Sequence, residues 1–449
     1  MKKVLFFSFL YVLFVIAAGE LRSAEQYNSK TTYSMPGYIV RYLNSPNSLD
    51  NSVPMTPCHE NNEQKQLINC TETCSFWKRL RFYGWLEGGF FVNSKGSTNQ
   101  HFSTISREGH SEDYQTLNSG NSSLLGNVKS ANPILNQFWI GLKRDLQTQH
   151  GFDWGFKTDF LFGMDAWLSQ SYGDASFDYR GHARDYYVSL PQIYGSLGYK
   201  NLSVKIGKFE TLLGVEQFEA AKSTFYSHSN LFYTEPQTHS GVLAEYRCKP
   251  NLWLDFGYVQ GADNSFRNDF DDHGFLGGIY WRPISSISVW YTVYAASLGN
   301  GRYKNGEYHQ GGTIFQHTFA VNWMISPRWH YTFQWNIGDR NGGHTASDAT
   351  YFGTAHYLTF QIYQHLKIGL RFDQIHANQW MSDAGFSRPF TGNYTGDLYG
   401  VTLGLNWSPY NRLNIRPELR YDFAQDSRPF NYGRKREQFS AGCGFVYLF

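Results

Sequence analysis

The chain of 449 residues has a formal net charge of +2 and no long run of charges of one sign, which argues against a nucleic-acid-binding protein. Its mean hydropathy is too polar for a bundle of transmembrane helices, whereas its aromatic content of 18 % is high for a soluble domain. A chain of this length can form two or three ordinary domains or one large barrel.

The first predicted element is a short apolar run from Val4 to Ala18, preceded by Lys2 and Lys3. This pattern is typical of a secretory signal peptide and is too short for a membrane-spanning helix. We expect cleavage after Ala18 or Gly19, so residues 1–19 are assigned to the signal. No cysteine follows the apolar run directly, so a lipid-anchored lipoprotein is not expected.

A polar segment without periodicity, residues 20–78, comes next and is expected to lie in the periplasm. Three cysteines gather in it: Cys58, Cys70 and Cys74. A disulfide among them fits an oxidising compartment, but the sequence leaves the pairing open. Zinc binding is the weaker alternative because the spacing of the possible ligands is irregular.

From residue 79 to the C-terminus, apolar and polar residues alternate with the period of two that β-strands require. The stretch from Trp329 to Ile337 is a clear example, with large apolar side chains on one face and His330, Thr332, Gln334 and Asn336 on the other. We predict sixteen strands, at 80–93, 133–143, 154–165, 190–199, 202–209, 240–248, 252–260, 273–282, 287–296, 313–324, 329–338, 351–362, 366–374, 398–407, 413–423 and 438–449.

The links between these strands alternate between short turns and long polar loops, and the last strand ends on Phe449. A sandwich gives no reason for such alternation, whereas an outer-membrane barrel has short periplasmic turns and long outer loops. The predicted fold is therefore all-β: a transmembrane antiparallel up-and-down β-barrel over residues 79–449, in the outer membrane of a Gram-negative-type bacterium. About sixteen strands leave a lumen too wide for side chains to fill.

The face of each strand opposite the apolar one is expected to line this lumen and carries charges of both signs. The candidate pore-lining residues are Lys157, Asp159, Arg247, Arg282, Lys367, Arg371, Arg416, Glu418 and Arg420. The same face includes Glu87, Asp165, Lys205, Glu245, Asp255, Asp373 and Asp422. Such charges set the ion preference of a pore, but a wet wall also needs polar residues and can pair them without any selectivity.

One loop of about thirty residues, 210–239, is a candidate constriction. Its acids are Glu210, Glu216 and Glu219, and aromatic residues follow them. Loops of this length are usually functional or disordered. We expect it to fold into the lumen with its acids opposite Arg371, Arg416 and Arg420. The alternative is an external loop packed on its neighbours.

Several motifs in this region resemble those of the putative β-barrel porin-2 (OmpL-like) family. They are 84–89 (GWLEGG), 153–159 (DWGFKTD), 190–194 (LPQIY), 207–216 (GKFETLLGVE), 225–229 (FYSHS) and 235–242 (EPQTHSGV). The resemblance runs from about residue 80 to the C-terminus and implies an outer-membrane porin-like barrel. It implies no catalytic residues and no particular solute, and the segment before residue 78 departs from it.

The sequence therefore predicts a porin that lets ions and small polar solutes diffuse passively, with outer-membrane lipids around it and no nucleic acid, enzymatic activity, cofactor or metal. Two alternatives stay open: a barrel with an adhesive or structural role, and a barrel lipid hydrolase using Ser227 and His228. The hydrolase is disfavoured because adjacent residues on one strand cannot form a nucleophile–base pair. Sixteen-stranded porins often assemble as trimers, so a homo-trimer is expected by analogy of fold.

Overall fold

The computed structural model describes residues 79–94, 132–171, 178, 182–183, 186–268, 271–298, 303–304, 307–308, 311–341, 348–379, 394–430 and 434–449. The predicted signal peptide (1–19) and the predicted periplasmic segment (20–78) with Cys58, Cys70 and Cys74 lie outside the described residues. Among the described residues no helix is both long and apolar enough to cross a bilayer.

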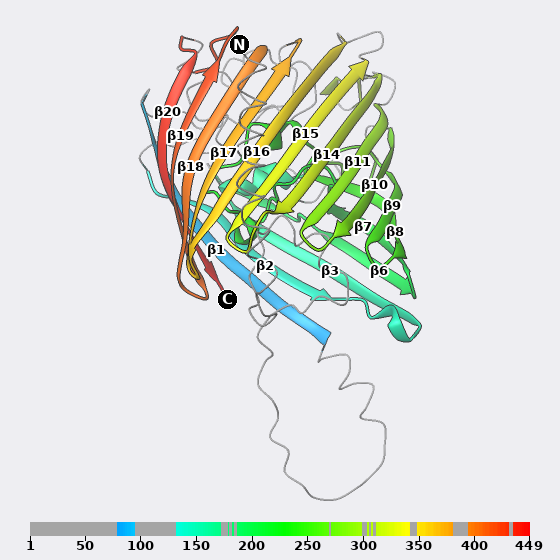
Figure 1. Cartoon of the computed structure of the whole chain (residues 1–449). Coiled ribbons are helices and arrows are strands. Elements are labelled where there is room, and N and C mark those ends of the chain that lie inside the picture. Colours follow the sequence, from blue (N-terminus) through cyan, green and yellow to red (C-terminus); the bar gives the residue numbers. More distant parts are fainter. Residues whose placement is uncertain are drawn as a thin grey trace, which may run out of the picture.

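Sixteen strands form one continuous wall (Figure 1). They are β1 (Leu80–Asn93), β2 (Ile134–Arg144), β3 (Phe152–Gly163), β6 (Ile193–Tyr199), β7 (Leu202–Glu210), β8 (Thr238–Lys249), β9 (Leu252–Val259), β10 (Asp272–Ile284), β11 (Ile287–Leu298), β14 (Thr313–Met324), β15 (Trp329–Asn341), β16 (Ala349–Tyr363), β17 (Leu366–Ala377), β18 (Gly396–Tyr410), β19 (Leu413–Ala424) and β20 (Glu437–Leu448). Each pairs antiparallel with the next, and β20 pairs with β1, from Trp85 opposite Leu448 to Asn93 opposite Ser440. The wall is therefore a closed barrel, and the predicted fold class and strand number are confirmed.

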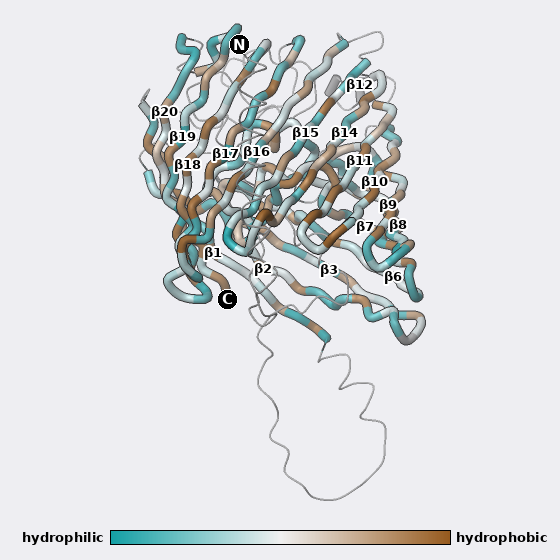
Figure 2. The backbone as a smooth tube through the Cα atoms, in the orientation of Figure 1, coloured by the Kyte–Doolittle hydropathy of each residue, from teal (hydrophilic) through white to brown (hydrophobic). Residues whose placement is uncertain are grey.

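The alternation of side chains explains why these segments form strands with one face in lipid. On β18, Val401, Leu403 and Leu405 point outward and are exposed, whereas Thr402 between them is fully buried. The same change from apolar to polar recurs along the other strands (Figure 2). A closed barrel pairs every strand edge, which is the condition for β-structure in a bilayer.

All sixteen predicted strands agree with the observed ones to within three residues at each end. At two of them the chain leaves the predicted strand for another element, near the end of the barrel opposite the short turns. The strand predicted at 154–165 ends at Gly163, and the chain turns into the 3-10 helix η5 (Met164–Ser169), which carries Asp165. The strand predicted at 190–199 begins only at Ile193. The short strand β5 (Tyr186–Ser189) precedes it and pairs with the last residues of β3, Leu161 to Gly163. Gly163 has a φ of 148°, which favours glycine and allows this break.

Small elements complete the described part of the chain. They are η4 (Thr148–His150), β4 (His182–Ala183), η6 (Ala220–Lys222), η7 (Leu231–Thr234) and the hairpin of β12 (Tyr303–Lys304) with β13 (Glu307–Tyr308).

Lys208 falls in the lipid-facing register by sequence, but the structure buries it. Its ammonium group donates to the backbone carbonyl of Ser169 at 2.8 Å and lies 3.3 Å from the carboxylate of Asp178. The segment that follows β3 therefore covers this cation. Alternation along β7 could not reveal that cover.

Candidate functional site

The chain between β7 and β8, residues 211–237, lies inside the barrel against its inner wall (Figure 1). We call it the inserted segment. The backbone N–H of Gly214 donates to the hydroxyl of Thr318 on β14 at 3.1 Å, and that of Val215 donates to Gln334 on β15 at 3.2 Å. Ala220 donates in the same way to Gln137 on β2. The segment thus reaches across the bore from one side of the wall to the other.

Two buried arginines on the wall hold the middle of the inserted segment. Arg371 on β17 donates to the backbone carbonyl of Ser227 at 2.6 Å and to its hydroxyl at 2.9 Å. Arg420 on β19 donates to the same hydroxyl at 3.2 Å and to the side-chain carbonyl of Asn230 at 2.8 Å. Hydrogen bonds from an ionised donor are about twice as strong as neutral ones, so this pair of arginines fixes the segment in place.

Glu216 provides the matching negative charge from the segment itself. Its carboxylate lies 3.2 Å from Arg371 and 3.1 Å from the His228 ring, and it accepts the N–H of Ser229 at 2.9 Å. Burial alone would raise the pKa of Glu216, but Arg371, His228 and the Ser229 N–H outweigh it and lower that pKa to about 2. The carboxylate is therefore charged at neutral pH.

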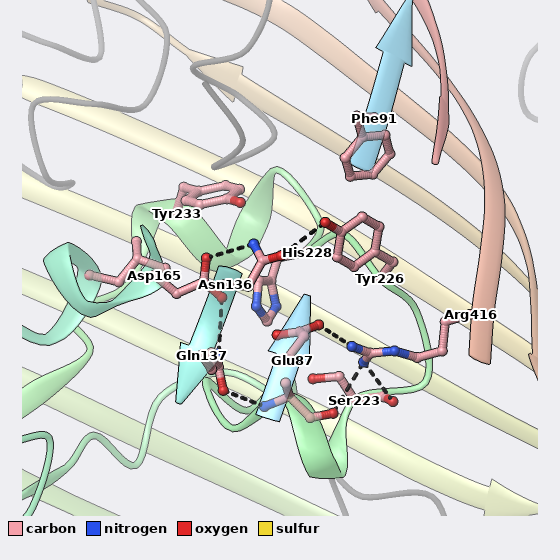
Figure 3. Close-up of a pocket in the computed structure, with 12 residues that line it drawn as sticks. Glu87, Phe91, Asn136, Gln137, Asp165, Ser223, Tyr226, His228, Tyr233 and Arg416 are labelled. Carbon is pink, nitrogen blue, oxygen red and sulfur yellow. Dashed lines mark hydrogen bonds and ion pairs between the residues drawn. The ribbon is translucent and has the colours of Figure 1, made fainter. Parts of the chain in front are cut away.

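Arg416 on β19 anchors the part of the segment that precedes Ser227, the residue to which Arg371 and Arg420 donate. It forms an ion pair with Glu87 on β1 and donates to the backbone carbonyl of Ala220 at 3.1 Å (Figure 3). It also donates to the backbone carbonyl of Phe225 at 3.0 Å. Beside it, Glu418 accepts the N–H of Tyr226 at 2.9 Å. Charged side chains of the wall therefore bind backbone carbonyl and N–H groups of the segment.

A small hollow remains between the wall and the segment, and polar groups line most of it (Figure 3). Asp165 of η5 points into it and accepts hydrogen bonds from Gln137 at 3.0 Å and Asn136 at 3.2 Å. Burial raises the pKa of Asp165. The Tyr226 hydroxyl donates to Asn136 at 2.9 Å and closes one side of the hollow.

Glycines of the wall receive the aromatic rings of the segment. The ring of Tyr226 lies over Gly444 on β20 and stacks on Phe91 with ring centroids 4.8 Å apart. A Cβ atom at Gly444 would lie 2.4 Å from the Tyr226 ring. The ring of Phe225 fits over Gly404 in the same way. These close contacts show that wall and segment are packed as one body.

The charged residues predicted to line the pore lie on the inner wall, but the segment covers many of them. Arg371, Arg416, Arg420 and Glu418 are at most 4 % exposed, so they hold the segment and do not line open water. Of the three acids predicted to face these arginines, only Glu216 does so. The carboxylate of Glu219 pairs with Lys222 instead, and Glu210 accepts a hydrogen bond from Gln192.

The remaining candidates lie on other parts of the wall. Lys157 is 3.2 Å from the buried Asp159 and 3.6 Å from Glu219. Arg247, Arg282 and Lys367 are partly buried next to short turns, near the ends of β8 and β10 and at the start of β17. The structure therefore separates the nine candidates into a covered cluster of four, a half-buried group of four, and Asp159, which is fully buried beside Lys157.

Sequence reasoning missed the role of Glu235. It directly follows η7 and accepts hydrogen bonds from Gln334 and Asn336 on β15, both at 2.5 Å. Gly214, with a φ of 79°, lies against this carboxylate. The period-two pattern had placed both amides on the inner face, but it could not indicate which acid they would meet.

Ser227 and His228 are not arranged for nucleophilic catalysis. The Ser227 hydroxyl accepts hydrogen bonds from two guanidinium groups, and the His228 ring pairs with Glu216 and stacks on Phe232 at 3.8 Å. A nucleophile needs a base within hydrogen-bond reach of its own hydroxyl. Among the described residues, no three His, Cys, Asp or Glu side chains gather as a metal site would require.

The profile of the putative β-barrel porin-2, OmpL-like, family matches residues 79–449. The chain belongs to this family. It is therefore a porin-type barrel of the outer membrane, as the sequence motifs indicated. No curated protein sequence matches the chain.

Solved outer-membrane barrels share the fold at low sequence identity. OmpT of Vibrio cholerae is 11 % identical, with a TM-score of 0.52, over 82 % of this chain and 97 % of that one. OprB of Pseudomonas putida is 14 % identical, with a TM-score of 0.51, over 85 % and 96 %. OmpF of Salmonella typhi, solved with daunomycin, is 11 % identical, with a TM-score of 0.52, over 82 % and 97 %. At such identities the likeness concerns the fold alone.

Proposed function

We propose that this barrel is a passive channel for ions and small polar solutes, narrowed by the inserted segment. The observation that carries the proposal is that Arg371, Arg416 and Arg420 hold residues 211–237 against the inner wall. We call this set of contacts, together with Glu216, the clasp. It fixes a folded segment across part of the bore and leaves other charged wall residues half-buried. A wall of sixteen strands encloses more space than its own side chains fill.

A segment held in place by charge-assisted hydrogen bonds fits a permanent constriction better than a plug that must leave the bore before solutes can pass. Its contacts involve both backbone and side chains on β2, β14, β15, β17 and β19. Glu216 anchors this constriction, and Glu219 joins it to Lys157 on the wall. Glu210 lies just outside it, as the last residue of β7, and accepts a hydrogen bond from Gln192.

Purified protein reconstituted into planar bilayers tests the proposal. A channel gives stepwise increases in conductance whose size varies linearly with salt. A barrel that is folded by circular dichroism, resists proteolysis and passes no current would overturn it. Such a result would favour an adhesive or structural barrel.

We also propose that the protein has no enzymatic activity. The support is the pairing of the Ser227 hydroxyl with Arg371 and Arg420 instead of with a base. Phospholipid hydrolysis by the reconstituted protein that disappears in S227A would contradict this proposal.

The remaining expectations also need experiments. A homo-trimer surrounded by outer-membrane lipids is proposed from the analogy of fold, and cross-linking in native membranes tests it. N-terminal sequencing of the mature protein tests cleavage of residues 1–19. Thiol labelling before and after reduction tests a disulfide in the proposed periplasmic segment, residues 20–78.

A further inference from the structure

Acidic and basic side chains of the inner wall differ in how far they are buried. Among the described strand residues, the inward-facing acids are mostly buried: Glu87, Asp159, Asp255, Asp373, Glu418 and Asp422. Seven of the inward-facing bases, by contrast, are only partly buried: Arg81, Lys143, Lys157, Lys205, Arg247, Arg282 and Lys367. The partly buried inward-facing acids of the strands are Glu210 and Glu245. Bases therefore predominate among the wall charges that can reach water in the bore.

Three of these bases lie in one row across adjacent strands. Arg81 on β1 is opposite Lys143 on β2, and Lys143 is opposite Lys157 on β3. The ammonium groups of Lys143 and Lys157 lie 5.8 and 5.9 Å from the centre of the Tyr83 ring, on the same inner face.

The row continues beyond β3. Lys157 is opposite Tyr194 on β6, and the ammonium group of Lys205 on β7 lies 5.6 Å from the centre of the Tyr194 ring. Lys222 of the inserted segment adds another partly buried cation near Lys157, because both contact the carboxylate of Glu219.

The needs of folding do not explain this alignment. Like charges directly opposite each other on paired strands destabilise the sheet. Each acid near the row lies beside a base: Asp145, in the turn after β2, is 3.3 Å from Lys143, Asp159 is 3.2 Å from Lys157, and Glu219 is 2.6 Å from Lys222. Asp159 and Glu219 are almost fully buried, whereas the bases of the row are only partly buried and face the bore. Elsewhere in the barrel, Arg371, Arg416 and Arg420 are covered together with Glu216, Glu87 and Asp422. They add little to the field in open water.

We infer that the channel prefers anions, and that the row of Arg81, Lys143, Lys157 and Lys205 on the inner wall of β1–β7 sets this preference. Basic side chains on a pore wall raise the local concentration of anions and repel cations. The ligands it fits are small anionic solutes such as chloride, phosphate or carboxylates. The inference rests on the proposed channel function and adds its ion preference.

The reversal potential of the reconstituted protein in a KCl gradient tests this inference. We expect the reversal potential to have the sign of a channel that is more permeable to chloride than to potassium. In K143Q/K205Q the ratio of chloride to potassium permeability is expected to fall by about threefold, because the two removed charges attract anions and repel cations, and water and salt screen most of this effect. Neither side chain holds the inserted segment, so the unitary conductance should remain measurable.

Lys200 supplies a matched control. It is exposed in the turn between β6 and β7, and its ammonium group lies 5.1 Å from the centre of the ring of Tyr199, which points to the lipid side. K200Q removes the same charge outside the bore and should leave the reversal potential unchanged. A conducting protein that prefers cations, or a K143Q/K205Q channel as anion-selective as the original, would overturn the inference while the channel function stands. Absence of any conductance would overturn both.

Discussion

Arg371 on β17 donates a 2.6 Å hydrogen bond to the backbone carbonyl of Ser227, a residue 144 positions earlier in the chain. Arg371 is fully buried and also contacts Glu216 and the hydroxyl of Thr402. One side chain of the wall thus fixes both backbone and carboxylate of the inserted segment. The position of the segment in the bore therefore depends on side chains that are distant in the sequence.

Replacement of Arg371 by methionine should release the inserted segment. It leaves the buried carboxylates of Glu216 and Asp373 without their common cation, and such a loss costs about 3–5 kcal/mol. We expect a lower melting temperature in detergent and a larger, noisier unitary conductance. Thermal circular dichroism and bilayer recordings measure the two effects. R328M, at an exposed turn, should change neither, and an unaltered conductance in R371M would show that the segment does not limit the current.

A side chain at Gly444 should displace the segment by steric conflict alone. A Cβ there lies 2.4 Å from the ring of Tyr226, so the aromatic ring must leave its place on β20. We expect G444V to be less stable by about 1–3 kcal/mol, which is the usual cost of overpacking. Urea titration followed by tryptophan fluorescence measures the change.

Gly195 is the control for this substitution because a Cβ there meets no atom within 4 Å. G195A should leave both stability and conductance unaltered. In a Y226A background G444V should cost less stability than in the original protein, since the small side chain removes the conflict. If G444V and G195A behaved alike, the close contact of Tyr226 with the wall would not exist in solution.

Acid should weaken the clasp through Glu216. Its pKa in the folded protein, about 2, is below the ordinary value of 4.5 because Arg371, His228 and the Ser229 N–H outweigh burial. A carboxylate with a lowered pKa stabilises the fold fully above the unfolded value, and this contribution is lost as pH falls from about 4.5 towards 2. The loss amounts to about 3 kcal/mol.

Conductance and melting temperature measured from pH 6 down to pH 2 would report this change. E216Q carries no titrating group at this position, so its unfolding free energy should be lower at neutral pH and should vary less with acid. A steeper dependence in E216Q than in the original protein would assign the acid sensitivity to other carboxylates.

The wall could be predicted from the sequence because a period of two is a local property. Trp329 to Ile337 alternates without interruption, and the strand there is found where it was expected. The covered cluster could not be predicted in the same way. Arg416 and Lys367 both read as inward-facing bases, yet one is buried under the segment and the other is partly exposed. Alternation along a strand predicts the side of the barrel wall on which a residue lies, whereas the burial of its side chain depends on a loop that is distant in the sequence.

The partners within the site show the same limit. Glu87 and Arg416 are 329 residues apart, and no local pattern links them. The glycines provide the one signal that was overlooked. Gly369 on β17 lies between the inward-facing Lys367 and Arg371, Gly404 on β18 is opposite it, and both lie under the ring of Phe225. Neighbouring strands with glycine on the inner face therefore mark where something else packs against the wall.

The polarity of the wall gives the last prediction. Leu403 lies in the middle of β18, points into the lipid and is 45 % exposed, whereas Tyr410 ends the same strand and is 72 % exposed. Because a lysine at the bilayer midplane costs about 2–4 kcal/mol and one near the interface about 0–1, L403K should destabilise the barrel far more than Y410K. Urea titration of folding into lipid vesicles measures the difference. In detergent the gap should shrink, because the charge can reach water there. Equal losses in vesicles for the two variants would mean that the outer face of β18 does not meet the hydrocarbon layer.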